Sequence, residues 1–232
     1  MLKLISLELR KYRFSRLIVY AIMVDIALLL FLTMIGIPDY GSEDYAYSTF
    51  SGSFELIDTF VRVTFMIFAG VLLSIMIIGE YRNKTLSVLF MYPIKRYKLI
   101  AAKLIIIFFF TFGMILFTDV LMSSALVTLN HYYPFIEDSL TMEQVRSLLL
   151  AYTFSSLSAA SMALIPLLFG MHKHSVTTTM VFSILLVLIV CSGINGPLVS
   201  INSNIIIHLS LGAAGLWIAL LSIFRLEMRD VN

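Results

Sequence analysis

The chain has 232 residues, of which 60% are hydrophobic and 13% charged, and its net charge is +2. A water-soluble globular domain carries roughly 25% charged residues, so this composition excludes a soluble protein and predicts an all-α, polytopic membrane protein. The small net charge gives no reason to expect a nucleic-acid partner. The single cysteine, Cys191, excludes an intramolecular disulfide.

Residues 1–16 form a basic segment with helical periodicity. Leu2, Ile5, Leu9 and Tyr12 fall on one face of a helix, and most of the basic residues fall elsewhere. This pattern predicts a cytoplasmic amphipathic helix that lies in the plane of the membrane interface. A simple basic anchor is the alternative interpretation.

Six apolar stretches approach the length of about 20 residues that a helix needs to cross a bilayer. They are residues 17–37, 56–79, 99–129, 148–171, 176–198 and 205–224. Together they predict a transmembrane domain over residues 17–224, followed by a cytoplasmic tail over 225–232. The third stretch is long, so we expect it to be tilted or to extend beyond the bilayer.

The distribution of charge predicts the orientation, because lysine and arginine are retained on the cytoplasmic side. The basic residues gather before the first span, between the second and third, in the next inner loop and in the tail: Lys3, Arg10, Lys11, Arg13, Arg16, Arg82, Lys84, Lys95, Arg96, Lys98, Lys173, Arg225 and Arg229. The acidic residues gather in the opposite loops: Asp39, Glu43, Asp44, Glu55, Asp58, Glu137, Asp138 and Glu143, with Arg146 as their only base. We therefore expect a plasma-membrane protein with both termini in the cytoplasm.

Motifs that are typical of soluble enzymes are incomplete or absent in this sequence. The stretch from Gly79 to Thr85 resembles a phosphate-binding loop, but Asn83 stands where that loop needs a second glycine. No zinc helix and no nucleophile elbow occurs in the sequence. His172 and His174 make a metal site conceivable, but without an acidic or thiolate companion we expect loop residues and no metal. An integral membrane enzyme is therefore the least favoured class.

The loop over residues 80–98 combines an apolar helical face with a basic end. Leu86, Leu89 and Phe90 recur at helical spacing, and Pro93 ends that short helix. Lys95 and Arg96 follow. One interpretation is a re-entry turn on anionic headgroups; the other is a plug that docks into a groove of a soluble partner.

The same stretch resembles the signature of ABC-2 type transporter permeases. That signature has an acidic residue at the end of the second helix, a threonine five residues on, then Pro-[Ile/Leu]-x-Arg and a lysine entering the third helix. Here these are Glu80, Thr85, Pro93-Ile94-Lys95-Arg96 and Lys103. The sequence departs from the family pattern at Lys84, where glycine is common, and at Lys95, where serine or threonine is common.

The resemblance implies the fold of the ABC-2, or type V, exporters and a half-transporter. The permease would pair with a second copy or a paralogue in the lipid bilayer, and a separate ATPase subunit would bind ATP and Mg, so the chain itself would hold no cofactor. Loop 80–98 would be the coupling helix, with contacts from Glu80, Thr85, Leu86, Leu89, Phe90, Pro93, Lys95 and Arg96. The small permeases of this kind resemble exporters of antimicrobial or cytolytic peptides, so an amphipathic peptide is the expected substrate, with lipids and hydrophobic drugs next. A stand-alone secondary transporter or channel is the alternative.

Three ionisable residues fall inside the predicted spans: Asp25, Arg62 and Asp119. A charge near the bilayer centre costs about 2.5–3.5 kcal/mol, so each should face protein or water. Arg62 and Asp119 lie at similar heights, which predicts an ion pair between the second and third spans. Asp25 has no basic partner at its height and is a candidate for lining a substrate path or the subunit interface.

The fourth span carries a face of small residues. Ser155, Ala159 and Ala163 recur at every fourth position. Such a face lets two helices approach closely in a membrane. We expect it to serve packing rather than chemistry.

Overall fold

The structure is a computed structural model, and all of the regular secondary structure in the residues that it describes is helical. It describes residues 2–12, 14–36, 49–82, 96–132, 136, 141–173, 175–192, 210 and 212–217. The helices are α1 (Leu2–Lys11), α2 (Phe14–Gly36), α3 (Phe50–Leu73), the π-helix η1 (Ser74–Ile78), α4 (Gly79–Arg82), α6 (Arg96–Tyr132), α7 (Met142–Met162), α8 (Pro166–Lys173) and α9 (Val176–Ser192).

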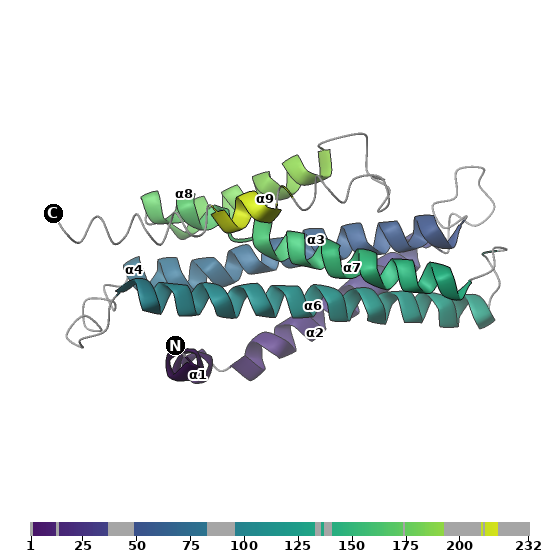
Figure 1. Cartoon of the computed structure of the whole chain (residues 1–232), viewed down its shortest axis with the longest axis horizontal. Coiled ribbons are helices and arrows are strands. Elements are labelled where there is room, and N and C mark those ends of the chain that lie inside the picture. The colour runs from purple at the N-terminus through teal and green to yellow at the C-terminus, as the bar shows by residue number, and fades with distance from the viewer. Residues whose placement is uncertain are drawn as a thin grey trace.

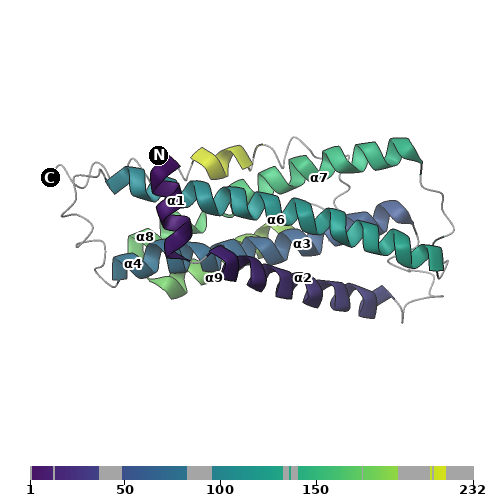
Figure 2. The ribbon, with the colours of Figure 1, turned by 90° about the horizontal axis from the view of Figure 1, so that it is seen from below.

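The long helices form an elongated bundle, and α1 lies crosswise at one end of it (Figures 1 and 2). At this end, which we call the α1 end, α4 leaves the bundle and α6 enters it. The 37 residues of α6 span about 55 Å at 1.5 Å per residue. This helix therefore runs from the α1 end to the opposite end as one continuous rod.

Four helices are long and apolar enough to cross a membrane: Ser15–Met34, Phe50–Ile78, Lys98–Tyr132 and Met142–Met171. They coincide with the first four predicted spans. The fifth predicted span coincides with a shorter apolar helix, Val176–Val190. Of the sixth, residues 205–224, only 210 and 212–217 lie within the described residues. The chain is therefore a helical protein with several membrane spans, and the total of six stays a prediction.

Two helices begin earlier than the hydropathy pattern predicts, because a threonine caps each of them. The amide of Gly52 donates to the Thr49 hydroxyl at the start of α3 (3.2 Å). At the start of α7, Thr141 and Gln144 form a reciprocal capping box. Four residues assigned above to outer loops, Glu55, Asp58, Glu143 and Arg146, therefore lie inside helices instead.

The fourth predicted span is broken rather than continuous. Pro166 has no amide hydrogen and cannot continue the ladder of α7. The preceding residues close tighter turns instead: the amide of Leu164 donates to Ser161 and that of Ile165 to Met162 (2.9 Å for the second). Helix α8 then starts at Pro166 itself, a position that proline tolerates well.

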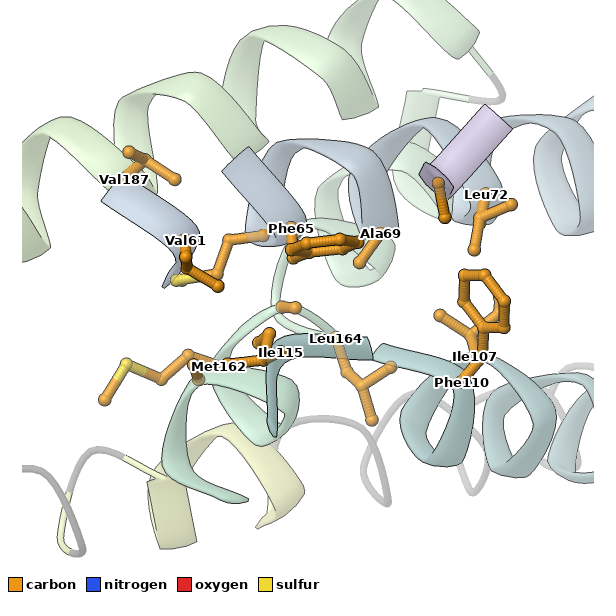
Figure 3. Close-up of a cluster of buried hydrophobic side chains, with 14 of the residues drawn as sticks. Val61, Phe65, Ala69, Leu72, Ile107, Phe110, Ile115, Met162, Leu164 and Val187 are labelled. Carbon is orange, nitrogen blue, oxygen red and sulfur yellow. The ribbon is translucent and has the colours of Figure 1, made fainter. Parts of the chain in front are cut away.

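The core of the bundle lies between α3 and its neighbours α6, α7, α8 and α9. Figure 3 shows Phe65 and Ala69 facing Ile115 and Leu164 across this core. Helix α2 contributes a narrow stripe of four buried residues, Ala21, Asp25, Leu28 and Leu32. Its other faces expose large apolar side chains such as Met23 and Met34, as expected for a helix bounded by lipid. Because lipid is as apolar as leucine, close packing rather than the hydrophobic effect holds such helices together.

Small residues bring α9 close to its neighbours. A methyl group added at Gly70 of α3 would lie 2.5 Å from the Ser183 hydroxyl of α9. A methyl group added at Gly170 of α8 would lie 2.0 Å from the Thr179 hydroxyl. The two helices α8 and α9 also stack Phe169 on Phe182, with ring centroids 3.9 Å apart. Glycine is therefore required at these two contacts by the lack of space.

Candidate functional site

Glu80 lies at the α1 end of the bundle, two residues beyond the last residue of the π-helix. In η1 the amide of Gly79 donates to the carbonyl of Ser74, five residues back. This wider turn changes the direction in which the following side chains point, and such turns are frequent at functional sites. Glu80 is thereby directed inward and is only 7% exposed, although it stands at the edge of the bundle.

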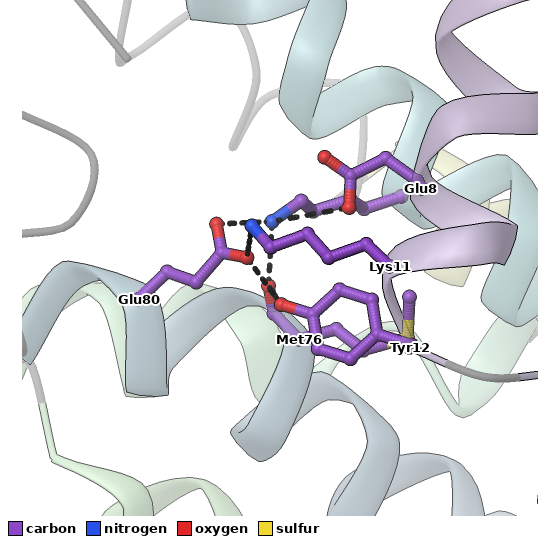
Figure 4. Close-up of polar contacts among 6 residues, drawn as sticks. Glu8, Lys11, Tyr12, Met76 and Glu80 are labelled. Atoms are coloured by element: carbon purple, nitrogen blue, oxygen red, sulfur yellow. Dashed lines mark hydrogen bonds and ion pairs between the residues drawn. The ribbon is translucent and has the colours of Figure 1, made fainter. Parts of the chain in front are cut away.

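Side chains from α6 and from the C-terminal end of α1 converge on Glu80 of α4 (Figure 4). Lys103 of α6 and Tyr12, which follows α1, both donate hydrogen bonds to its carboxylate. Lys11 of α1 forms an ion pair with Oε1 at 2.6 Å. Glu8, one turn earlier in α1, lies 3.8 Å from the Lys103 ammonium. We call these five residues, Glu8, Lys11, Tyr12, Glu80 and Lys103, the Glu80 cluster.

The backbone of the π-helix takes part in the same contacts. The carbonyl of Met76 accepts a hydrogen bond from Lys103 Nζ at 2.8 Å and another from the Tyr12 hydroxyl at 3.2 Å. The ammonium groups of Lys11 and Lys103 lie 5.5 and 5.6 Å from the centroid of the Tyr12 ring, within reach of a cation–π interaction. Tyr12 therefore connects α1 to both the backbone and the side chains around Glu80.

Burial and hydrogen bonding act in opposite directions on the two carboxylates of the cluster. Burial alone would raise the pKa of Glu80, but the hydrogen bonds from Lys103, Lys11 and Tyr12 outweigh it and hold that pKa below its ordinary value. For Glu8, burial prevails over the attraction of Lys103 and Lys11, so its pKa is raised. Burial also raises the pKa of Tyr12, and the hydrogen bond to Glu80 adds to the shift. Tyr12 thus remains a protonated donor and Glu80 a charged acceptor.

A second polar group lies within the membrane-spanning part of the bundle. Arg62 forms an ion pair with Asp58, one turn earlier in α3, with Nη2 and Oδ2 3.0 Å apart. The hydroxyl of Ser155 in α7 donates to both Asp58 oxygens, at 2.8 and 3.1 Å. The predicted pairing of Arg62 with Asp119 is therefore wrong, because the nearer carboxylate on the same helix takes the guanidinium.

Asp119 is fully buried, and neither of its carboxylate oxygens has a hydrogen-bond partner. Its neighbour along α6, Thr118, donates to Asp25 of α2 at 2.8 Å. One turn later, Ser123 shares a hydrogen bond of 2.7 Å with the Tyr152 hydroxyl of α7. The structure thus brings Asp25 and Asp119 to the same level of α6, in the half of the bundle away from the Glu80 cluster.

Among the described residues, no three histidine, cysteine, aspartate or glutamate side chains are grouped as a metal centre would require. His172 lies in α8, but the description does not extend to its side chain, and His174 lies outside the described residues. The expectation of no metal therefore stays a prediction.

Comparison with known proteins settles the family. Residues 4–192 match the family described as ABC-2 family transporter protein. The chain belongs to this family. It is also 34% identical to Uncharacterized protein YcbO of Bacillus subtilis (strain 168), over 229 residues that cover 99% of this chain and 100% of the relative. No solved structure matches. The chain is thus a multi-pass membrane protein of the transporter class and not an enzyme by itself.

The structure places the ABC-2 signature residues only in part. Glu80 and Lys103, at its two ends, are in direct contact. Arg96 is the first residue of α6, and its side chain is not described. The predicted coupling residues Thr85, Leu86, Leu89, Phe90, Pro93 and Lys95 lie outside the described residues. Their roles therefore stay predictions.

Sequence reasoning missed two members of these polar groups. Glu8 lies on the same helical face as Ile5, Leu9 and Tyr12, and an acidic residue on the apolar face of a basic helix is the signal that indicates an internal partner. The face of small residues predicts packing alone for Ser155, whereas its hydroxyl donates to Asp58. The other two residues of that small face, Ala159 and Ala163, are buried as expected.

Proposed function

We propose that this ABC-2 transporter is the transmembrane subunit of an ATP-driven exporter, and that loop 80–98 docks into a groove of a separate ATPase subunit. The observation that supports this most is the position of the Glu80 cluster. Glu80 is the first residue of the loop, Lys103 follows the loop, and the ion pair between them joins its two ends. A docking segment held in this way passes any displacement to both α3 and α6.

The Glu80 cluster also attaches α1 to the base of the loop. Lys11 and Tyr12 contact Glu80, and Glu8 contacts Lys103. A movement of the loop would therefore shift α1, which lies crosswise at the same end (Figure 2). We propose that α1 rests in the plane of the cytoplasmic membrane interface and that both termini face the cytoplasm of the cell.

The proposed subunit assembly and substrate follow from the resemblance of this chain to the small ABC-2 permeases. We propose that two membrane subunits pair, either two copies of this chain or this chain with a paralogue, and that each rests on an ATPase subunit that binds ATP and Mg. The proposed substrate is amphipathic or hydrophobic, with a peptide of the antimicrobial or cytolytic type as the first candidate.

Co-purification tests the docking. The chain is expressed together with a P-loop ATPase encoded beside it, and the complex is isolated through a tag on the chain. Leu89→Asp places a charge on the only apolar face that the loop's predicted helix offers, while burial of such a side chain contributes about 1.5–3 kcal/mol. We expect this variant to insert in the membrane and to lose the ATPase.

Two control variants sharpen the result. Leu89→Met keeps the apolar volume and should retain the ATPase, and Lys95→Ala should weaken it only slightly, because an exposed charge contributes roughly 0–1 kcal/mol. If the Leu89→Asp protein inserts normally and still retains a fully active ATPase, the docking proposal is wrong and the loop is a surface turn.

A further inference from the structure

The polar group inside the membrane-spanning bundle contains one carboxyl group more than its cation can pair with. We call its residues Asp58, Arg62, Asp119 and Ser155 the core carboxylate site. Arg62 balances Asp58, with which it forms the ion pair at 3.0 Å. Asp119 brings a second carboxylate, completely buried and with both oxygens free of hydrogen bonds.

The side chains around Asp119 do not supply the missing positive charge. From α3, Asp58 and Arg62 act on it electrostatically, but the guanidinium is committed to Asp58. From α7, the neighbouring titratable group is Tyr152, whose hydroxyl is shared with Ser123. From α2, it is Asp25, which accepts from Thr118. Of these neighbouring groups, Arg62 is therefore the cation, and it is already paired with Asp58.

An unpaired carboxylate is too costly in this place to stay charged. Isolated ions in the interior of a bilayer or a protein cost several kcal/mol, and they are kept where they pair or where function needs them. Hydrogen bonds to charged groups are stronger than those between neutral ones, so a positive ligand that donates to a carboxylate would be bound firmly. The site is thus built to receive one positive charge.

We propose that Asp119, with Asp58 beside it, binds the positively charged group of a transported amphiphile, an ammonium or a guanidinium, and that Asp119 carries a proton while the site is vacant. This inference rests on the proposed function, since it names the substrate class of the same transporter. The exchange is balanced: the neutral carboxylic acid releases its proton to water as the organic cation arrives, and the carboxylate then accepts hydrogen bonds from that cation.

Proton release on binding is the signature of this exchange. The purified full chain, alone in a neutral detergent and a weak buffer at pH 7, is titrated with dodecylammonium and, in parallel, with the uncharged dodecyl alcohol. We expect a saturable acidification with the ammonium probe and none with the alcohol. Asp119→Asn should abolish the acidification and weaken ammonium binding about 10- to 100-fold, the loss expected for one charge-assisted hydrogen bond.

Two further measurements remove ambiguity. Glu143→Gln is the control, because Glu143 is an exposed carboxylate in the first turn of α7, outside the core carboxylate site, and it should keep the acidification. Infrared spectra of the vacant wild-type chain should contain a carboxylic-acid band that Asp119→Asn removes. The variant should melt no lower than the wild type, because asparagine replaces a neutral acid of the same shape.

Several results would overturn the inference. They are equal ammonium binding by the wild type and Asp119→Asn, binding without proton release, loss of the acidification in Glu143→Gln as well, or a clear fall in the melting temperature of Asp119→Asn. A carboxylic-acid band that the ammonium probe leaves unchanged would reduce the site to a proton site and refute the substrate assignment. Because the assay uses the chain without an ATPase, failure of the docking experiment would leave these results unaffected.

Discussion

Replacing each carboxylate of the Glu80 cluster by the neutral glutamine should have opposite effects. Glu80→Gln removes the charge on which Lys103 and Lys11 converge and leaves a lysine that is 1% exposed without its principal partner. Breaking a buried ion pair by removing one partner costs about 3–5 kcal/mol. For a chain of this size that corresponds to a fall of about 6–20 °C in melting temperature.

Glu8→Gln is the matched control, because burial disfavours the charge of Glu8. Its pKa is raised, so glutamine should leave the melting temperature at neutral pH unchanged or slightly higher. Lys11→Met should also have little effect, since the Lys11 side chain is 45% exposed and such pairs contribute roughly 0–1 kcal/mol. The assay is thermal unfolding of each purified variant in the same detergent.

The pH dependence of stability follows from the shifted pKa values of Glu80 and Glu8. Glu80 has a lowered pKa, so its contribution to stability is present above the ordinary glutamate pKa of about 4.3 and is lost as the pH falls through the lower folded value. Glu8 has a raised pKa, so its contribution is lost as the pH rises through the folded value. The wild type should therefore be most stable on the acid side of neutrality, and Glu8→Gln should remove the decline toward neutral pH. If Glu80→Gln and Glu8→Gln have equal effects, the account of the cluster is refuted.

Three further predictions test the bundle. In a Cys191→Ser background, cysteines introduced by Ser42→Cys and Ser139→Cys should react with an impermeant reagent in intact cells, and the cysteine of Ser87→Cys should not. Labelling at residue 87 would show that the predicted orientation is wrong. Asp58→Asn and Arg62→Gln should each lower the folded yield, with partial recovery in the double variant, whereas strictly additive losses would disprove their pairing. Gly70→Ala should lower the melting temperature, because its methyl group would lie 2.5 Å from Ser183. Gly113→Ala should not lower it, because nothing lies within 4 Å of the added methyl group. Adding Ser183→Gly to the Gly70→Ala variant should restore the melting temperature.

The sequence predicts the helical class, whereas the ion pair between Glu80 and Lys103 appears only in the structure. Long apolar runs have few alternatives in a membrane, since every backbone group must be bonded within a helix. The family-like spacing places an acid at the first residue of loop 80–98 and a lysine shortly after the loop. The spacing alone does not fix the distance between these two residues, and the packing of α6 beside the π-helix brings them into contact.

The errors arise where a local contact competes with a distant one. Arg62 pairs with Asp58 because the two lie one turn apart on α3 and need no other helix to meet. The charge pattern assigns Asp58 to an outer loop at the edge of the predicted span 56–79, since that pattern does not register the Thr49 cap that starts α3 at Phe50. Likewise the break before Pro166 depends on backbone bonds that apolar composition does not encode.

The most direct test of the central claim is transport driven by ATP. The chain and its ATPase are reconstituted together in liposomes, and the movement of a fluorescent cationic amphipathic peptide is followed with ATP on the side of the ATPase. We expect transport that requires hydrolysable ATP, that Leu89→Asp abolishes and that Leu89→Met preserves. Transport that proceeds equally without the ATPase, or that a proton gradient alone sustains, would contradict the proposed exporter and favour a stand-alone secondary transporter.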